Sequence, residues 1–440
     1  MKIKDFLAID YLILLPVMAL TIIGIVFIYS SGVNVDGDIV SNEYIKQIIW
    51  AALGLILAMI LAMMNYRRFY NFSLYLYLLS LIPLVYTLVF SRMVQSIHSA
   101  RWIRIGAFGL QASEFVKITT IIFLARYLTD TKRNPRTFMR FIVSCVIVFV
   151  PMIIVLIQPD LGTALVFIPI LIFMVFIAGL SMRYVIFLVS SIALIGILTV
   201  LPLWQTYILQ RTIPILSILT NSRLILIVIM SFCIIMAIAL FGLRKFKKRY
   251  FFWILYGVSI VVLSLGVSYA AREVLKEYQI MRLIVFLDPG VDPLRAGWNI
   301  IQSVTAIGAG GLSGQGFMQG TQSNYRYLPG QSTDFIFSIF SEEMGFIGGI
   351  AVFILFLIIC LRLLRIVKST SDPFASYICA GIAAMFSFHF LINVGMTMGI
   401  MPVTGIPLLF MSYGGSSIIS AMIGVGLALS IHVRRFFQEL

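Results

Sequence analysis

Long runs of apolar residues recur along the whole chain, separated by short polar segments. Twelve runs are long enough, or nearly so, to cross a bilayer as an α-helix: about 11–31, 45–64, 73–91, 114–128, 141–157, 163–179, 184–203, 224–242, 251–270, 335–363, 374–396 and 412–433. Each must be helical, because an isolated strand would leave backbone groups unpaired in lipid. The pattern predicts an all-α polytopic membrane protein, with residues 1–440 as a single integral-membrane domain.

Composition supports the membrane class. Of the 440 residues, 61% are hydrophobic and 11% charged, and the mean hydropathy is +1.06. A soluble domain cannot bury that much apolar surface in one core. The first run follows Lys2 and Lys4 without a small-residue cleavage site after it, so we expect it to stay as the first transmembrane helix.

The distribution of basic residues predicts the topology. The chain has 32 Lys and Arg against 17 Asp and Glu, a net charge of +15. If the N-terminus is cytoplasmic and the twelve runs alternate, 20 of the 32 basic residues fall on the cytoplasmic side. Cytoplasmic loops carry such an excess in membrane proteins. We therefore expect both termini to be cytoplasmic.

One long segment, 271–333, has no spanning run and falls on the extracytoplasmic side, before the third-last helix. Asp292 and Pro293 can start a helix, and Gly308 can end it. Between them, apolar residues repeat at helical spacing: Ile300, Ile301, Val304 and Ile307. This predicts an amphipathic helix at the outer membrane surface. The six glycines from Gly308 to Gly320 indicate a tight, folded loop.

Ionisable residues at membrane depth are costly, so they are candidate functional residues. Glu114 and Lys117 are three positions apart at the start of the fourth run, which places them on one helix face. They can form an internal ion pair that fixes helix packing, or they can contact substrate. The spacing leaves both roles open.

Four further acidic residues stand at or below the membrane boundaries. Asp160 lies in a short outer turn and can cap the next helix or sit at a cavity mouth. Asp334 lies where the long outer segment re-enters the membrane, so it is a candidate general base, with helix capping as the alternative. Glu342 and Glu343 stand about two turns deeper, where they can line the same cavity or pair with a neighbour.

Several common site types are not indicated. His98, His389 and His432 are scattered without metal-ligand spacing. The glycines of 308–320 lack the GxxxxGK[ST] pattern of a nucleotide loop, and no GxSxG motif is present.

Six ordered blocks span nearly the whole chain. They are Arg101-Trp102-Ile103 with Gln111-Ala112-Ser113-Glu114-Phe115-Val116-Lys117; Gln158-Pro159-Asp160-Leu161-Gly162-Thr163; Phe286-Leu287-Asp288-Pro289 with Asp292-Pro293; Gly297-Trp298-Asn299-Ile300-Ile301-Gln302-Ser303; Tyr327-Leu328-Pro329 with Thr333-Asp334-Phe335-Ile336-Phe337 and Glu342-Glu343-Met344-Gly345; and Gly395-Met396 through Pro402-Val403-Thr404-Gly405-Ile406-Pro407 to Ser412-Tyr413-Gly414-Gly415-Ser416-Ser417. Together they resemble the SEDS family (shape, elongation, division and sporulation proteins).

The resemblance implies a family core of ten helices. The runs 224–242 and 251–270 would then be an extra pair, in a probable inserted segment at 205–270. Gly320-Thr321-Gln322 and the block 402–407 resemble the elongation branch of the family, and the division branch is the alternative.

The resemblance also implies a function: a peptidoglycan glycosyltransferase that polymerises lipid II during cell elongation and so maintains rod shape. The family's essential aspartate matches Asp334, which would take the proton of the acceptor hydroxyl while undecaprenyl diphosphate leaves. Cations would stabilise that leaving group, and Arg104, Lys117 and Arg282 are candidates. The other substrate-binding candidates are Trp102, Glu114, Asp160, Gln302, Thr333 and Ser416.

Other family properties follow as expectations. They are a divalent cation (Mg²⁺ or Mn²⁺), a class B penicillin-binding protein as transpeptidase partner within the elongation machinery, a location in the bacterial inner membrane, and no nucleic-acid partner. Three residues depart from the family pattern near Asp334: Gly330, Ser332 and Arg326. Arg326 would favour the ionised form of Asp334 if close. A lipid II flippase or other transporter, and a non-catalytic scaffold for the transpeptidase, are the alternative functions.

Overall fold

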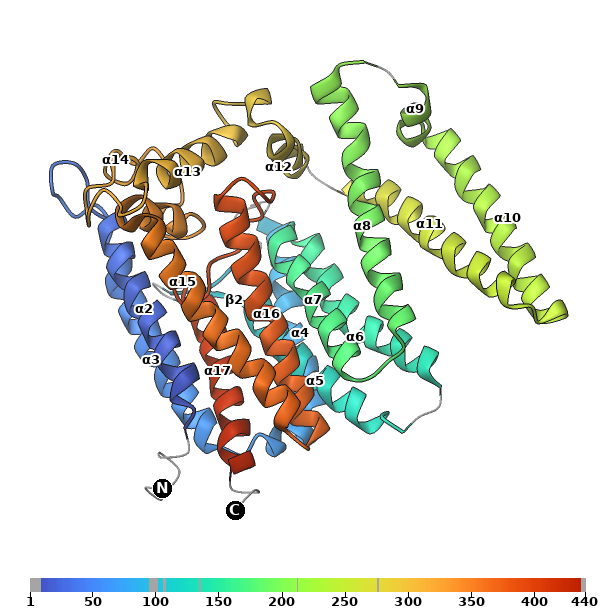
Figure 1. Ribbon diagram of the computed structural model, residues 1–440, viewed down its shortest axis with the longest axis horizontal. Helices are drawn as coiled ribbons and strands as arrows, with labels where there is room; N and C mark the ends of the chain where they lie inside the picture. The colour runs from blue at the N-terminus through green and yellow to red at the C-terminus, as the bar shows by residue number, and fades with distance from the viewer. Residues whose placement is uncertain are drawn as a thin grey trace. The chain divides into compact units, whose positions relative to one another are not determined.

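The computed structural model describes residues 9–94, 102–105, 108–133, 136–211, 213–274 and 277–436. These residues are almost entirely helical (Figure 1). Their contacts divide the chain into two compact units: unit 1, with Met1–Leu180 and Asn299–Leu440, and unit 2, with Ser181–Trp298.

Unit 1 is a helical bundle with one β-hairpin. Its elements are α2 (Tyr11–Ser31), α3 (Glu43–Met63), α4 (Arg67–Val94), β1 (Trp102–Ile105), β2 (Phe108–Gln111), α5 (Ala112–Asp130), α6 (Thr137–Ile157), α7 (Leu161–Ile177), most of α13 (Ala296–Gly310), α14 (Thr321–Asn324), α15 (Ile336–Ser369), α16 (Pro373–Thr397) and α17 (Gly415–Phe436). The strands pair antiparallel, with Trp102 opposite Gln111.

Unit 2 is built on three long helices. Its elements are α8 (Met182–Trp204), the π-turn η1 (Gln205–Leu209), α9 (Pro214–Thr220), α10 (Ser222–Phe246), α11 (Arg249–Val274), α12 (Glu277–Leu287), the 3-10 turn η2 (Pro289–Val291) and the start of α13. Thr199 in α8 bonds to Ser268 in α11, and the Tyr256 hydroxyl in α11 donates to the Arg183 carbonyl in α8. These two helices therefore run parallel.

All twelve predicted spanning runs are helices, so the prediction of an all-α polytopic membrane protein is confirmed. Within the described residues, ten helices are long and apolar enough to cross a membrane. The other two runs are α5, which carries four charged side chains in 19 residues, and α7, which has 17 residues.

The core of unit 1 surrounds α16 and α17, whose spanning windows are 78% and 83% buried. Small residues let helices approach closely. A Cβ at Gly426 in α17 would lie 2.8 Å from the Cα of Ala58 in α3, and one at Gly54 would lie 2.9 Å from the Met422 side chain. Close backbone approach of this kind is how helices pack when lipid supplies no hydrophobic driving force between them.

The two ends of unit 1 differ in character. At one end, Asp10 before α2 pairs with Arg362 late in α15 at 2.9 Å, and Arg434 of α17 donates to the carbonyl of Ala62. The described chain begins and ends here, since the start of α2 and the end of α17 both lie at this end (Figure 1). At the other end, the hydroxyl of Ser30 donates to Glu343 near the start of α15. The turn that contains Asp334 therefore lies opposite the termini.

The predicted amphipathic helix exists, but it starts later than predicted. It is α13, which begins at Ala296 rather than at Asp292. Ile300 is buried in the protein, and Val304 is 45% exposed. The face turned to the protein also carries Ser303: its hydroxyl lies 2.6 Å from that of Ser338 and donates to the Thr397 carbonyl at 2.7 Å. A small polar residue therefore helps to anchor the helix to the protein, which hydropathy spacing does not predict.

The long segment 271–333 also contains two elements that the sequence pattern did not predict. α11 continues to Val274, and α12 follows from Glu277 to Leu287. The segment is therefore mostly helical rather than an open loop.

Candidate functional site

Asp334 lies in a tight turn just before α15. The turn starts at Gly330, whose φ is +68°, and the Gly330 carbonyl accepts the backbone N–H groups of Thr333, Asp334 and Phe335 at 3.1 to 3.2 Å. The Asp334 carbonyl accepts a hydrogen bond of 2.9 Å from the Asn393 amide. The backbone is thus held from both sides, while the Asp334 side chain is half-buried.

The capping alternative for Asp334 is wrong. The N-cap of α15 is Phe335, and no side chain caps that helix end. Asp334 stands one residue before that position, so it is not the N-cap of α15.

The residues that depart from the family pattern have defined roles. Gly330 supplies the positive φ of the turn, which L-residues with a Cβ rarely adopt. The Ser332 hydroxyl donates to Glu43 of α3 at 2.6 Å, and the Ser332 carbonyl accepts from the Tyr413 N–H at 2.7 Å. Burial and the nearby negative charge of Glu43 raise the pKa of the Tyr413 hydroxyl. The turn is therefore bound to α3 and to the segment before α17.

Arg326 does not take part in this arrangement. It is exposed, its φ is +56°, and within the described part of the chain its side chain makes no hydrogen bond or ion pair. The expectation that Arg326 acts on Asp334 gains no support from the geometry.

Glu114 and Lys117 form a buried ion pair of 2.9 Å, and both side chains are at most 3% exposed. Lys117 also lies 3.0 Å from Nε2 of His389, and the Ser420 hydroxyl donates to Glu114 at 3.2 Å. Nδ1 of His389 lies 3.1 Å from the Pro407 carbonyl, which can only accept, so Nδ1 carries the hydrogen and Nε2 accepts from the ammonium. Of the two roles left open, internal pairing is the one that the geometry supports.

This buried network reaches the Asp334 turn through α16. His389 and Asn393 are four residues apart, on one face of the helix. Asn393 donates to the carbonyls of Asp334 and Ile406, while His389 bonds to Pro407. The loop 398–414 therefore joins the Glu114–Lys117 pair to the backbone of Asp334.

Asp160 is the N-cap of α7, which is one of its two predicted roles. It accepts from the N–H and the hydroxyl of Thr163 at 3.2 and 3.0 Å. It also accepts from the Gln111 side chain at 2.9 Å, and the Gln111 N–H donates to Ser416 at 2.8 Å. Asp160 and Ser416 are both buried, so they bind the hairpin, α7 and α17 together.

The other candidates are dispersed. Trp102 stands on β1 and is 41% exposed, while the side chain of Arg104 lies outside the described residues. Gln302 is half-buried on α13, and the Thr333 hydroxyl donates to the Gly330 carbonyl at 3.3 Å. Arg282 belongs to unit 2, where its guanidinium lies over the Tyr278 ring.

Glu342 and Glu343 do not face open space; both are fully buried. Glu342 accepts from the N–H groups of Gln322 and Ser323 and from the Thr321 hydroxyl, so it caps α14. Glu343 accepts from the Ser30 hydroxyl and from the Met318 N–H. Of the two predicted roles, pairing with neighbours is the one observed.

The glycine-rich loop, residues 308–320, packs against a break in α15. At Gly345 the backbone leaves the helical region, with φ +66° and ψ −164°. The loop supplies the missing hydrogen bonds: Gln315 and Gly316 donate to the carbonyls of Glu342 and Glu343, and the N–H of Phe346 donates to Gly311. Broken helices are tolerated at membrane depth only where such groups are satisfied within the protein.

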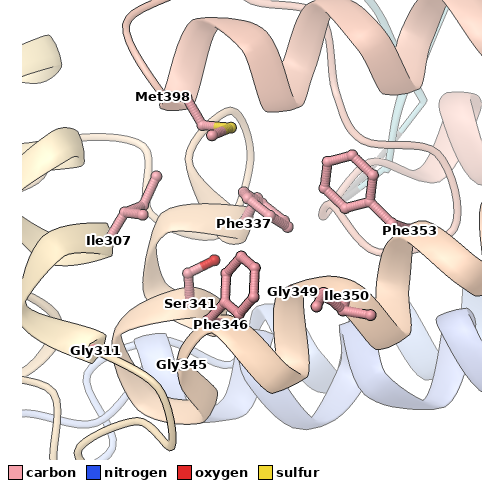
Figure 2. A pocket seen from close by; sticks show the side chains of 10 residues that line it. All are labelled: Ile307, Gly311, Phe337, Ser341, Gly345, Phe346, Gly349, Ile350, Phe353 and Met398. Atoms are coloured by element: carbon pink, nitrogen blue, oxygen red, sulfur yellow. The ribbon is translucent and has the colours of Figure 1, made fainter.

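A cavity of about 320 Å³ lies beside this break (Figure 2). Its lining residues are Ile307, Gly311, Phe337, Ser341, Gly345, Phe346, Gly349, Ile350, Phe353 and Met398. The Ser341 hydroxyl is the one polar side-chain group among them, so the cavity suits an apolar group. Asp334 is not among its lining residues, so the cavity is separate from the Asp334 turn.

A metal cage is not present in the described part of the chain, where no three His, Cys, Asp or Glu side chains lie together.

Several residues that organise the site carry little signal in the sequence: Glu43, Gln47, His389, Asn393 and Ser420. Gln47 donates to the Ser412 carbonyl and accepts from the Gly414 N–H. The one available signal was the spacing of His389 and Asn393, two polar residues one turn apart in an apolar helix.

Known proteins resemble this chain over its full length. The protein in Treponema pallidum (strain Nichols) named peptidoglycan glycosyltransferase RodA is 47% identical over 435 residues, with 99% of this chain and 100% of the relative covered. Stage V sporulation protein E of Bacillus subtilis is 31% identical, with 96% of each covered. Peptidoglycan glycosyltransferase MrdB of Escherichia coli K12 is 30% identical, with 98% and 95% covered.

Solved structures agree on the fold. A chain from a study of polymerization and crosslinking by a peptidoglycan synthase complex matches with TM-score 0.65 and 24% identity, covering 98% of this chain and 99% of the other. Thermus thermophilus rod shape determining protein RodA matches with TM-score 0.59 and 22% identity over the same shares. The family model for FtsW, RodA and SpoVE, described as cell cycle protein, matches residues 10–224 and 204–436. The chain therefore belongs to this family of multi-pass membrane proteins, the SEDS family.

Proposed function

We propose that this chain is the peptidoglycan glycosyltransferase of cell elongation, polymerising lipid II into glycan strands. The observation that carries the proposal is its 47% identity, over the whole length of both chains, with a protein named peptidoglycan glycosyltransferase RodA. Relatives named for sporulation or division are about 30% identical. The elongation role is therefore preferred to the division role.

In the proposed reaction, Asp334 is the general base. Its carboxylate takes the proton of the acceptor sugar hydroxyl as that oxygen attacks the anomeric carbon of the donor. The bond from that carbon to the diphosphate oxygen breaks, and undecaprenyl diphosphate leaves with the bonding electrons. A half-buried carboxylate on a turn fixed by Asn393 and Gly330 suits this role, because proton transfer requires a base held in position.

The leaving diphosphate needs positive charge. Arg104 on β1 is proposed to supply it, because Lys117 is fully buried and already bonded to Glu114 and His389. The proposed role of Lys117 is to hold α5, α16 and the loop 398–414 together beneath the site.

We also propose that a divalent cation, Mg²⁺ or Mn²⁺, accompanies the diphosphate of the substrate. When bound, it would neutralise charge on the leaving group. Within the described residues, no three His, Cys, Asp or Glu side chains lie together to hold it. The proton transfer proposed for Asp334 does not depend on this cation.

The proposed location is the bacterial inner membrane, with both termini cytoplasmic and Asp334 extracytoplasmic. Asp334 lies at the end of unit 1 opposite the termini, and the predicted charge bias puts the termini inside. The proposed partner is a class B penicillin-binding protein. The support is that a solved relative comes from a study of a complex that both polymerises and crosslinks peptidoglycan.

The test is polymerisation of labelled lipid II by the purified chain, with Asp334→Asn as the variant. General-base catalysis contributes about 100-fold or more, so we expect the rate to fall at least that far while labelled lipid II still binds. The matched control is Asp36→Asn, an exposed carboxylate in the loop between α2 and α3, at the same end of unit 1, which should leave the rate unchanged.

The possible failures can be told apart. Equal rates for wild type and Asp334→Asn would remove Asp334 as the base but leave the activity. A wild type that moves lipid II across vesicle membranes without polymerising it would establish the transporter alternative. A polymerisation rate that a chelator does not change, and that added Mg²⁺ or Mn²⁺ does not raise, would exclude the proposed cation.

A further inference from the structure

The hairpin of α10 and α11 in unit 2 ends in a dense positive cluster, here called the basic tip. It consists of Arg244, Lys245, Lys247, Lys248 and Arg249, five basic residues in six positions, all exposed. Lys247 ends α10 in a left-handed conformation with φ +52°, its N–H bonded to the Leu243 carbonyl. The cluster therefore covers the last turn of α10, the connecting turn and the first residue of α11.

The sequence around the basic tip holds no acidic residue that could neutralise it. The chain has no Asp or Glu from Leu161 to Arg272, while that stretch carries nine Lys and Arg. The first acidic residue after the tip is Glu273, at the far end of α11, roughly 36 Å away at 1.5 Å per residue. Within the described residues, the basic tip takes part in no ion pair.

Aromatic rings form a band directly next to the basic tip. Phe246 stacks on Phe251 with ring centres 6.0 Å apart, Tyr250 contacts Phe251, and Trp253 contacts Tyr256. The guanidinium of Arg183 lies 5.5 Å from the Phe252 ring and 5.7 Å from the Trp253 ring. Trp and Tyr gather at the membrane–water interface, so this band marks the headgroup level.

The two helices hold the basic tip at that level. Both α10 and α11 are apolar enough to span a membrane, and their windows are only 11% and 17% buried within the protein. We therefore expect lipid to cover most of the hairpin, so that the headgroup phosphates are anions within reach of the tip.

We infer that the basic tip binds the phosphate groups of anionic phospholipids. The site is independent of the proposed catalytic function, since all of its residues belong to unit 2 and none of them is proposed to touch substrate. Juxtamembrane clusters of Lys and Arg are attracted to anionic headgroups, and the aromatic band offers an apolar contact that a soluble anion cannot use.

The experiment uses the full chain, delipidated in a neutral detergent and titrated with phosphatidylglycerol or phosphatidylcholine, with bound lipid counted by native mass spectrometry. We expect phosphatidylglycerol to bind more tightly, and added salt to weaken it. Each basic residue near an anionic surface contributes about a fivefold factor in affinity. The double variant Lys247→Gln/Lys248→Gln should therefore lose more than tenfold.

The matched control is Arg211→Gln/Arg223→Gln, which removes two exposed charges near the other end of α10. It should change phosphatidylglycerol affinity less than threefold. Unchanged binding in the tip variant, or an equal loss in the control, would overturn the inference. Displacement by soluble glycerol phosphate at similar concentration would show a free-anion site and overturn it too. Unaltered thermal unfolding of both variants establishes that they are folded.

Discussion

The helices α17 and α10 are both long apolar segments, yet they have opposite surroundings. The spanning window of α17 is 83% buried in protein, and that of α10 is 11% buried. α17 carries Ser416 and Ser420, which bond to Gln111 and Glu114. Between its charged ends, α10 is almost purely apolar, and its Ser231 bonds back to the Ile227 carbonyl of the same helix.

Of these two helices, the more hydrophobic one is the less buried in protein. A helix facing lipid must be apolar on every side, because lipid offers no partner to a polar group. A helix inside the bundle can carry polar side chains, since neighbouring helices supply partners. Substitutions should therefore be costly in the polar interior of unit 1 and nearly free on the lipid face of α10.

The largest effect is expected from breaking the Glu114–Lys117 pair. Lys117→Met leaves Glu114 as a buried charge without its cation, which costs about 3–5 kcal/mol. The free energy of unfolding in a denaturing-detergent titration measures it. The double variant Glu114→Gln/Lys117→Met should lose less than Lys117→Met alone; a larger loss would mean that the pair is not coupled.

The second-largest loss of stability is expected in the glycine-rich loop, residues 308–320, where it packs against the break in α15. A Cβ at Gly314 would lie 2.0 Å from the Glu343 carbonyl oxygen, at a φ of +83°. Gly314→Ala should cost about 2–4 kcal/mol through strain and displacement of the loop. The control is Gly257→Ala in α11, where a Cβ meets nothing within 4 Å and the helix should gain slightly. Equal stability of the two variants would contradict the close approach.

A smaller effect is expected at His389. His389→Leu leaves Lys117 with one partner fewer and removes the donor to the Pro407 carbonyl, which costs about 1–3 kcal/mol. Because the loop 398–414 also bonds to Asn393, polymerisation should fall together with stability. Retention of full stability would show that the network does not depend on the imidazole.

The smallest effect is expected on the outer face of α10. Ile234 and Ile238 are each 61% exposed within unit 2, so lipid takes the place of protein neighbours there. Ile234→Leu should change the free energy of unfolding by no more than about 0.5 kcal/mol. A loss of 2 kcal/mol or more would mean that another protein surface, not lipid, covers this face.

Some features of the site could be predicted from the sequence because they depend on local spacing. The capping role of Asp160 and the pairing of Glu114 with Lys117 were among the predicted possibilities, since the partners stand three residues apart. The start of α13 and the N-cap of α15 were wrong because such boundaries depend on contacts with distant segments. Ser303 at the buried face of α13 is one example.

By itself, the sequence determined that the chain crosses a membrane many times, where its long apolar helices lie, and which family it belongs to. Apolar runs have one stable form in lipid, so these properties follow from local composition and ordered motifs. Only the tertiary structure decided which polar groups meet: His389 and Lys117 are 272 positions apart, and Ser30 and Glu343 are 313 apart. A polar residue in an apolar helix requires a partner, but the packing of the helices selects it.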